Sequence, residues 1–298
     1  MLIPKFVEFK TSDGLTLPGL LYRAKGAKKI VIYLHGNGSS SIFYDEKEHR
    51  DLPEILNEKG ISLLKFNNRG ANIIKKFTIK KNGVEKRVPF GMAFEKIKDC
   101  VLDINAAVKF LQKLGYKEFY LAGVSTGANK ICVYDHYQRR NIFKKYILIC
   151  GGDDTGIYYD QLGKLKFFNL LAKAKRKIKK GEGLEIAIET LPFGEIFSYQ
   201  GFYDIANPDG DYNTFPFSEA FRGVEISKKP LFRYFKSIKK QSIVIYGEKD
   251  EYAWGEINKV IQVLKKYQPS FEYRVIKGAD HRFTGKQRKL ANIIADWL

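Results

Sequence analysis

Apolar residues follow two alternating patterns along most of the chain. Continuous apolar runs, such as KIVIYL at residues 29–34 and ISLLKF at 61–66, are typical of strands buried on both faces of a parallel sheet. Apolar positions spaced by three and four over 94–113 predict a helix with one buried stripe. This repeated order of strand and helix predicts an α/β fold, a doubly wound and mostly parallel sheet.

Two segments carry hairpin signals instead. Residues 5–23 form two short β-compatible stretches around Ser12-Asp13-Gly14. Residues 72–89 are basic and centre on Asn82-Gly83, a pair that favours a type I′ turn because both positions need positive φ. We therefore expect antiparallel hairpins at both places.

Residues 153–237 interrupt the alternation. They are aromatic, basic and irregular, with one predicted helix at 163–180, and the alternation resumes with QSIVIYG at 241–247. This predicts a core formed by 1–152 and 238–298, with 153–237 inserted as a lid. Because the insertion follows a strand, we expect it over the carboxyl edge of the sheet, where ligands bind in open α/β sheets.

The pentapeptide GVSTG at 123–127 matches G-x-S-x-G. A buried strand precedes it and a helix follows, the context in which this motif presents a nucleophilic serine on a sharp turn. The flanking glycines are needed because side chains there would clash as the chain reverses. Ser125 is therefore the candidate nucleophile, the alternative being a serine that serves only the turn.

A serine hydroxyl needs a base to remove its proton. Among the four histidines, His35 opens HGNGSS, His49 lies on an early charged helix, and His136 lies three turns beyond Ser125. His281 alone follows a strand and sits in a loop, so we expect it to be the base. Its alternative role is to cap the last helix.

The base in turn needs a carboxylate to hold its tautomer. Asp250 follows the strand SIVIYG and lies between Ser125 and His281 in the chain, which is the order Ser…Asp…His. We therefore predict Asp250 as the acid. Other carboxylates that could take this place are Glu248, Glu251, Asp153 and Asp154.

A tetrahedral intermediate needs hydrogen-bond donors for its oxyanion. The backbone N–H of Thr126, the residue after the candidate nucleophile, is one expected donor. The second is Asn37, in the small-residue loop HGNGSS after the first buried strand. The same loop could be a plain glycine-rich turn, and it lacks the full motifs of phosphate-binding loops.

Together these motifs make the chain resemble the α/β-hydrolase superfamily. They are HGNG at 35–38, NNRG at 67–70, GVSTG at 123–127, GEKDEY at 247–252 and GADHRF around His281. The resemblance covers 1–152 and 238–298, and it implies an eight-stranded sheet with Ser125 as nucleophile, His281 as base and Asp250 as acid. The basic hairpin at 72–89 departs from any particular subfamily.

The composition of the chain excludes several classes of protein. The 298 residues are 44% hydrophobic and 14% aromatic, which excludes a disordered chain, and no apolar run approaches the length of a membrane helix. The N-terminus lacks the apolar region of a signal peptide. Cys100, Cys132 and Cys150 are interpreted as buried thiols, so we expect a cytoplasmic protein.

The formal net charge is +19, and the segment 164–180 alone carries eight basic residues and no acidic ones. Its apolar side would comprise Leu165, Phe168, Leu171 and Ala172. Three interpretations are open: a solvated outer face, an amphipathic helix of 163–180 on an anionic membrane or drawing anionic substrates, and nucleic-acid contact. The first is favoured because charge runs are usually solvated, and no known nucleic-acid module is present.

The resulting hypothesis is a serine hydrolase that cleaves a carboxylic ester through an acyl-enzyme on Ser125. Acyltransferases, thioesterases and peptidases use the same groups, and a non-catalytic binding protein on the same fold is the alternative from another class. No metal or cofactor is expected. The many aromatic residues of 153–237 could line an acyl pocket or form the core of the lid itself.

Overall fold

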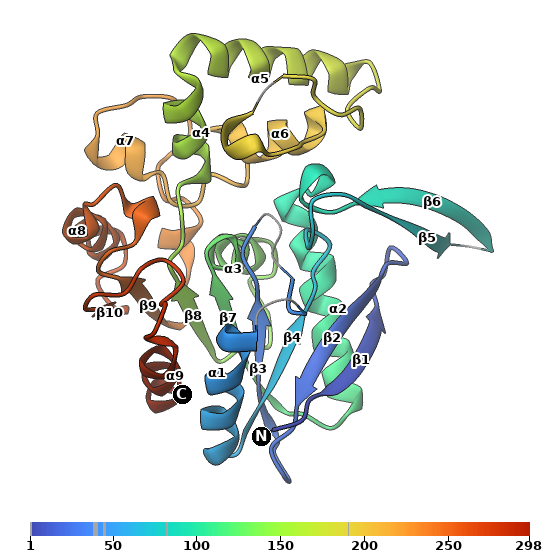
Figure 1. Cartoon of the computed structure of the whole chain (residues 1–298), viewed down its shortest axis with the longest axis vertical. Helices are drawn as coiled ribbons and strands as arrows, with labels where there is room; N and C mark the ends of the chain where they lie inside the picture. The colour runs from blue at the N-terminus through green and yellow to red at the C-terminus, as the bar shows by residue number, and fades with distance from the viewer. Residues whose placement is uncertain (1, 38–40, 44–45, 82, 190) are drawn as a thin grey trace.

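A computed structural model describes residues 2–37, 41–43, 46–81, 83–189 and 191–298. Eight strands form one sheet in the order β1-β2-β4-β3-β7-β8-β9-β10 (Figure 1), and β5 pairs with β6 in a separate sheet. The predicted doubly wound, mostly parallel sheet is confirmed.

The structure contains the following strands and helices. The strands are β1 Lys5–Lys10, β2 Thr16–Tyr22, β3 Lys29–Leu34, β4 Ile61–Phe66, β5 Lys75–Lys81, β6 Val84–Phe90, β7 Glu118–Val124, β8 Lys145–Ile149, β9 Gln241–Gly247 and β10 Glu272–Ile276. The helices are α1 Glu46–Glu58, α2 Cys100–Lys113, α3 Thr126–Tyr137, α4 Asp154–Leu162, α5 Lys164–Lys179, α6 Tyr199–Ala206, α7 Phe217–Phe221, α8 Ile257–Tyr267 and α9 Gln287–Trp297.

The order of the strands fixes which face each helix covers. From β3 the chain passes through α1 to β4, and from β4 it returns through α2 to β7 on the other side of β3. Because such crossovers are right-handed, the reversal of direction places α1 and α2 on opposite faces. Helix α9 packs against α1, and α3 packs against α2. Strands β3, β7 and β8 are thereby covered on both sides.

Both predicted hairpins form. β1 pairs with β2 in antiparallel fashion, and β2 pairs with β4 in the same way, so the sheet has an antiparallel edge. β5 and β6 form an arm that projects from the sheet below α5 (Figure 1). Gly83 has φ 81°, as the turn requires, whereas Asn82 lies outside the described residues.

The helix predicted over 94–113 is shorter than expected. It begins at Cys100, after 3₁₀ turns at Met92–Phe94 and Ile97–Asp99, and residues Glu95 and Lys96 between the turns are extended. The Ile97 N–H donates to the Asp204 carboxylate 2.7 Å away, and Glu95 pairs with Lys130. The apolar periodicity begins at Phe94, in the first 3₁₀ turn, but these tertiary contacts delay the start of the α-helix to Cys100.

The segment between β8 and β9, which we name the cap segment (residues 153–237), carries α4 to α7. It lies beyond the carboxyl ends of the parallel strands (Figure 1). Its aromatic side chains largely pack on one another, and the fully buried phenylalanines are Phe167, Phe197, Phe202, Phe215, Phe217, Phe232 and Phe235. Many of the aromatic residues that the sequence marks therefore form apolar core within the cap segment, and this core is continuous with that of the sheet.

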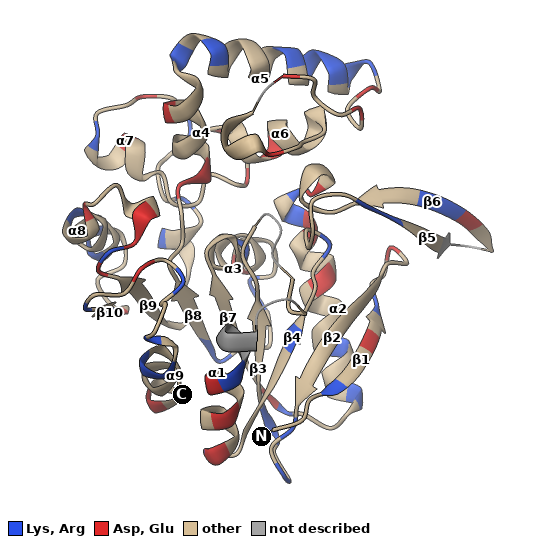
Figure 2. Ribbon diagram, viewed as in Figure 1, with Lys and Arg blue, Asp and Glu red and all other residues tan. Residues whose placement is uncertain are grey.

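The buried side of α5 differs from the expected one. Phe167, Leu170, Leu171 and Ala174 are buried, and the helix packs against α4 and α6. Of the predicted apolar side only Leu171 is buried, and Leu165 is 77% exposed. Lys and Arg cover the outer side of α5 and recur on the β5–β6 arm (Figure 2). The prediction was wrong because the predicted and the observed apolar sides both have helical spacing. Packing against α4 and α6 decides which of the two is buried.

None of the described helices is both long and apolar enough to span a membrane. The three cysteines are free and buried, as their sequence context predicts.

Candidate active site

Ser125 occupies a strained turn between β7 and α3. Its backbone has φ 54° and ψ −127°, a conformation that costs a non-glycine residue about 1–3 kcal/mol. The Ser125 N–H donates to the Ile149 carbonyl at 2.8 Å, and the Ser125 carbonyl accepts from Ala128 N–H at 2.8 Å. The turn is therefore held from both sides, and the serine side chain is only partly buried.

Two glycines make this turn possible. A β-carbon added to Gly123 would lie 2.3 Å from the carbonyl oxygen of Gly127, and one added to Gly127 would lie 2.4 Å from the carbonyl oxygen of Leu34. Both distances are far below van der Waals contact. The steric reason for the two flanking glycines in GVSTG is thus present in the structure.

The HGNG loop lies directly against the serine. A β-carbon added to Gly36 would lie 3.1 Å from the Ser125 β-carbon. His35 Nδ1 lies 2.7 Å from the Gly36 carbonyl, and His35 Nε2 accepts from the Asn68 N–H at 3.2 Å. Burial lowers the pKa of His35 to about 3, and the charge of Lys130 acts in the same direction. His35 is therefore a neutral residue that ties this loop to NNRG.

The two expected oxyanion donors flank this contact. Thr126 is the first residue of α3, so its N–H lies among those that have no partner within the helix, at the positive end of the helix dipole. Asn37 follows Gly36 in the loop beside Ser125. Residues 38–40, which complete HGNGSS, lie outside the described residues.

His281 and Asp250 are brought together. His281 Nδ1 lies 2.9 Å from Asp250 Oδ1 and 3.1 Å from Oδ2. The Asp250 side chain is only 2% exposed, and the Tyr252 N–H donates to Oδ1 at 3.0 Å. Burial lowers the pKa of His281, but the hydrogen bond to Asp250 and its charge outweigh this effect, so the pKa is raised above 6.5.

The other candidate carboxylates serve the backbone. Glu251 accepts from the His281 N–H at 3.0 Å, and Glu248 accepts from the Gly278 N–H at 2.8 Å. Asp153 caps α4 through the Gly156 N–H. Among the carboxylates that the sequence left open, Asp250 is thus the one hydrogen-bonded to the His281 ring in the described structure.

Sequence reasoning missed the position of Cys150. The Cys150 sulfur, an Asp250 oxygen and a His281 nitrogen all lie within 4.8 Å of one another. Burial raises the pKa of the Cys150 thiol well above its ordinary value, and the Asp250 charge and hydrogen bond add to this. The thiol therefore stays protonated and can donate to Asp250, which favours a hydrogen-bonded set over a metal site.

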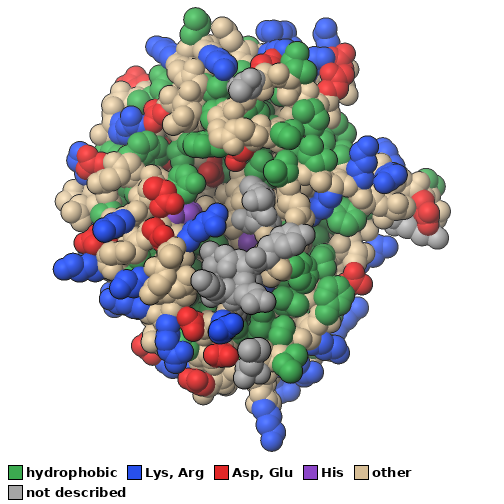
Figure 3. Space-filling view, viewed as in Figure 1, with side chains coloured by type: hydrophobic (Ala, Val, Ile, Leu, Met, Phe, Trp, Pro, Cys, Tyr) green, Lys and Arg blue, Asp and Glu red, His purple; other side chains and the backbone are tan. Residues whose placement is uncertain are grey.

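Asp154 is the second feature that the sequence did not resolve, beyond marking it as a possible acid. It begins α4 and lies close to the Thr126 hydroxyl and within the electrostatic reach of His281. Burial, with a smaller contribution from the charge of Glu195, raises the pKa of Asp154 to about 7. In Figure 3, acidic side chains are visible beside histidine in the hollow between the cap segment and the core.

A buried ion pair supports the turn from below. Lys130 of α3 is 1% exposed, and its ammonium lies 2.6 Å from Glu95 and 3.2 Å from the Asn68 amide oxygen. Asn68 also contacts His35, so the pair links α3 to NNRG and, through His35, to the loop beside Ser125. Nothing in the local sequence marks Lys130 or Glu95, because their pairing spans 35 residues of chain.

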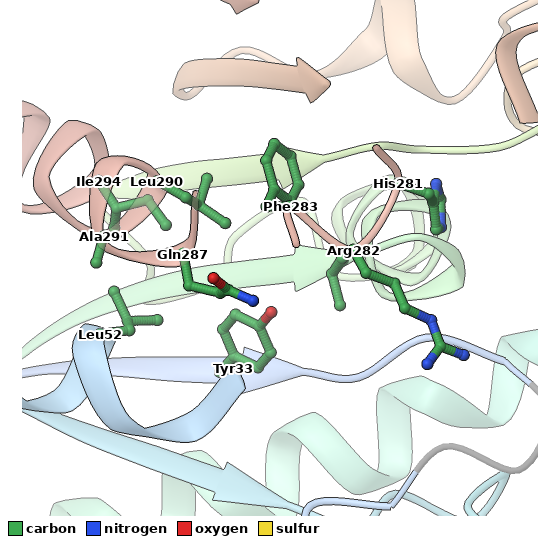
Figure 4. A pocket seen from close by; sticks show the side chains of 10 residues that line it. Tyr33, Leu52, His281, Arg282, Phe283, Gln287, Leu290, Ala291 and Ile294 are labelled. Atoms are coloured by element: carbon green, nitrogen blue, oxygen red, sulfur yellow. The ribbon is translucent and has the colours of Figure 1, made fainter. Parts of the chain in front are cut away.

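A small cavity lies behind the histidine loop. Val124 and His281 both line it, which places this loop beside the strand that ends at Ser125. Figure 4 shows the Tyr33 hydroxyl and the Gln287 amide facing each other, with Leu52 and Leu290 nearby. Its volume of about 40 Å³ holds a few water molecules and is too small for a substrate.

The remaining histidines lie elsewhere. His136 stacks edge-on with Tyr137 and Tyr234, at ring-centre distances of 5.0 and 4.5 Å. The side chain of His49 lies outside the described residues.

A family model described as "Protein of unknown function (DUF1749)" matches residues 91–297. The chain belongs to this family. The matched part of this DUF1749 protein includes Ser125, Asp250 and His281, and excludes the HGNG loop and the whole β5–β6 arm. Comparison with curated proteins gives no match.

Several solved structures share the fold. Est1E from Butyrivibrio proteoclasticus has a TM-score of 0.61 at 16% identity, over 98% of this chain and 96% of that one. The Pyrococcus furiosus esterase Pf2001 has a TM-score of 0.57 at 20% identity, over 100% and 92%. The carboxylesterase CesB from Bacillus subtilis has a TM-score of 0.54 at 15% identity, over 98% and 90%. The DUF1749 protein therefore has an α/β-hydrolase fold.

Proposed function

We propose that this protein is a serine hydrolase that cleaves carboxylic esters through an acyl-enzyme on Ser125. The observation that carries the proposal is the hydrogen bond from the His281 ring to the buried Asp250, in a loop beside the strained turn of Ser125. Strain at a partly exposed serine is what a presented nucleophile requires, and a purely structural turn gains nothing from it.

In the first half-reaction the Ser125 hydroxyl oxygen attacks the ester carbonyl carbon, and His281 Nε2 takes the hydroxyl proton. Asp250 holds the Nδ1–H and stabilises the imidazolium that forms. The N–H groups of Thr126 and Asn37 donate to the oxyanion. When the carbon–oxygen bond of the ester breaks, His281 returns the proton to the leaving alcohol.

In the second half-reaction a water molecule attacks the acyl carbonyl and gives its proton to His281. The carbon–oxygen bond to Ser125 then breaks, and His281 returns the proton to the serine oxygen. The products are a carboxylic acid and free enzyme.

We further propose that the cap segment acts as a lid over this site, above a core of residues 1–152 and 238–298. Two observations support this: α4 begins at Asp154, beside Thr126, and the segment lies over the carboxyl edge of the sheet. A solved structure of Est1E has ferulic acid bound, and this chain is similar to it with a TM-score of 0.63 at 16% identity. A small acyl group is therefore a reasonable first substrate class.

A fluorophosphonate probe tests the nucleophile. We expect labelling of the wild-type protein at Ser125 and no labelling of Ser125→Ala, whereas Ser270→Ala, an exposed serine far along the chain, labels normally. The wild type should hydrolyse a panel of p-nitrophenyl esters of increasing acyl length, and Ser125→Ala should hydrolyse none of them. A folded wild-type protein without labelling would instead support a non-catalytic binding protein.

A further inference from the structure

We propose that Asp154 binds a protonated amine carried by the acyl part of the substrate, so that the preferred substrates are short amino-acyl esters. This inference rests on the proposed ester hydrolysis and names its substrate class. Its starting point is a difference among three consecutive residues at the start of α4: Asp153 and Thr155 make hydrogen bonds within the cap segment, whereas Asp154 Oδ2 makes none with a described residue.

The two neighbours of Asp154 hold the cap segment together. Asp153 accepts from the Gly156 N–H at 2.7 Å and from the Ser218 N–H at 2.8 Å. The Thr155 hydroxyl donates to the Ile205 carbonyl at 2.9 Å. Asp154 lies between them, yet its buried Oδ2 makes no hydrogen bond with any described residue. This oxygen is therefore available to a ligand.

The position of Asp154 beside the reacting centre is fixed. The Asn129 amide group of α3 makes two hydrogen bonds with the backbone of Gly152, at 2.9 and 3.2 Å. Asn129 lies one turn after Ser125, so this clamp ties the chain leading into α4 to the nucleophile turn. Asp154 is thereby held close to the Thr126 side chain.

Two further polar groups in this place lack partners. The Thr126 hydroxyl and the Tyr212 hydroxyl belong to side chains that are 1% and 3% exposed, and neither makes a hydrogen bond with a described residue. The Thr126 hydroxyl lies close to both Asp154 and Tyr212. Buried polar groups are normally satisfied, so three such groups around one point indicate a site for a ligand.

A second carboxylate, Glu195, lies within electrostatic reach of Asp154. Glu195 accepts a hydrogen bond from Tyr158, which lies one turn after Asp154 on the same face of α4. Burial raises the pKa of Glu195 to about 7, as it does for Asp154. A bound cation would stabilise both carboxylates in the charged form, whereas a bound anion would be repelled by them.

The chemistry of this set selects an ammonium group. An ammonium has three N–H donors and no acceptor, and Asp154, Thr126 and Tyr212 each offer an acceptor oxygen. Because Thr126 directly follows Ser125, the ammonium would lie near the scissile carbonyl, one or two carbons away on the acyl chain.

Isosteric esters test the inference. Benzyl β-alaninate, benzyl 3-hydroxypropanoate and benzyl butanoate differ only in a terminal ammonium, hydroxyl or methyl group. We expect the wild type to favour the β-alaninate over the butanoate by about tenfold or more in kcat/KM, since charged hydrogen bonds in a buried site have this effect. Asp154→Asn, which keeps the shape, should remove that preference.

Asp160→Asn is the matched control. Asp160 lies on the same helix, but its carboxylate binds Arg222 and Trp254 outside this cluster, so the β-alaninate preference should survive. Equal turnover of the β-alaninate and the butanoate would overturn the inference while leaving ester hydrolysis intact. A stronger preference for the hydroxyl ester would replace the ammonium with a neutral donor and also overturn it.

A binding measurement separates this inference from catalysis. In Ser125→Ala protein, calorimetric titration compares β-alanine benzylamide with N-benzylbutanamide, which are uncleaved analogues of the same pair. We expect at least tenfold tighter binding of the amine, lost when Asp154→Asn is added. Preferential binding without any ester turnover would keep this inference and refute the proposed function, and equal binding would refute the inference.

Discussion

At the scale of single residues, the division of work among neighbouring carboxylates is the most specific feature of the site. Asp250 contacts the His281 ring, while Glu251 contacts its backbone N–H. The two side chains are adjacent in sequence and chemically alike, so exchanging each for its amide isolates the contribution of the ring contact.

We expect Asp250→Asn to lower kcat for p-nitrophenyl esters by about 10³–10⁴-fold, because an amide stabilises the wrong tautomer of His281 and cannot stabilise the imidazolium. Glu251→Gln should lower kcat by about tenfold or less, because its amide oxygen can still accept from the backbone N–H. Steady-state kinetics of both variants gives the comparison. A larger loss in Glu251→Gln would transfer the role of the acid to Glu251.

The pH profile is a second prediction at this scale. His281 must be neutral to accept the Ser125 proton. Burial lowers the pKa of His281, but the larger combined effect of Asp250, Glu251 and Asp154 raises this pKa above 6.5. Activity should therefore fall as the pH drops through this raised pKa, with a midpoint above that of an ordinary histidine. In Glu251→Gln, which removes one raising charge, the midpoint of kcat/KM should move to lower pH. An unchanged or higher midpoint would contradict this electrostatic account.

At the scale of elements, the nucleophile turn depends on close packing of backbone against backbone. In Gly127→Ala the new methyl group would lie 2.4 Å from the Leu34 carbonyl oxygen, so β3 and α3 would have to separate. We expect a loss of about 1–3 kcal/mol of stability, measured by urea denaturation, together with loss of labelling at Ser125. Gly152→Ala is the control, since nothing lies within 4 Å of its added methyl group. Equal stability of the two variants would show that the turn tolerates a side chain.

The sequence predicts this turn because each requirement is local: a buried strand, two small residues and a following helix. The start of α2 was not predictable in this way, since the contact of Ile97 with Asp204 joins segments 107 residues apart. The positions of Cys150 and Glu195 in the site were missed for the same reason. Asp154 could be marked only as a carboxylate after a strand, because its lack of a partner is visible only once Asp153 and Thr155 have found theirs.

Helix α5 provides a second prediction at the scale of elements. Its apolar stripe is buried against α4 and α6, so only basic side chains and isolated apolar ones such as Leu165 are available to a membrane. Stable interfacial binding needs an apolar face as well as charge. We expect no flotation with neutral vesicles, and with anionic vesicles only at low ionic strength. Flotation that persists at physiological salt would show that the stripe is released.

At the scale of the whole molecule, the charge of +19 and the acidic interior of the site have opposite signs. The basic groups lie on the outside, along α5 and the β5–β6 arm (Figure 2). Asp154 and Glu195, which belong to the cap segment, have carboxylates desolvated by burial. The long-range field is screened within about 8–10 Å at physiological salt, whereas a contact with Asp154 in a buried place is screened much less. The field of the basic exterior therefore acts on a substrate as it approaches, and the contact with Asp154 acts once the substrate is bound.

This separation predicts an unusual salt dependence. For a cationic ester such as benzyl β-alaninate, the positive exterior slows approach, so kcat/KM should rise about two- to fivefold as ionic strength increases from about 20 to about 300 mM. Neutral benzyl butanoate should show little change. The loss caused by Asp154→Asn should be the same at both salt concentrations, because that contact is shielded from the solvent. If kcat/KM for the cationic ester instead fell with salt, the exterior would be attracting it, and the field at the entrance would be set by the acidic groups of the site.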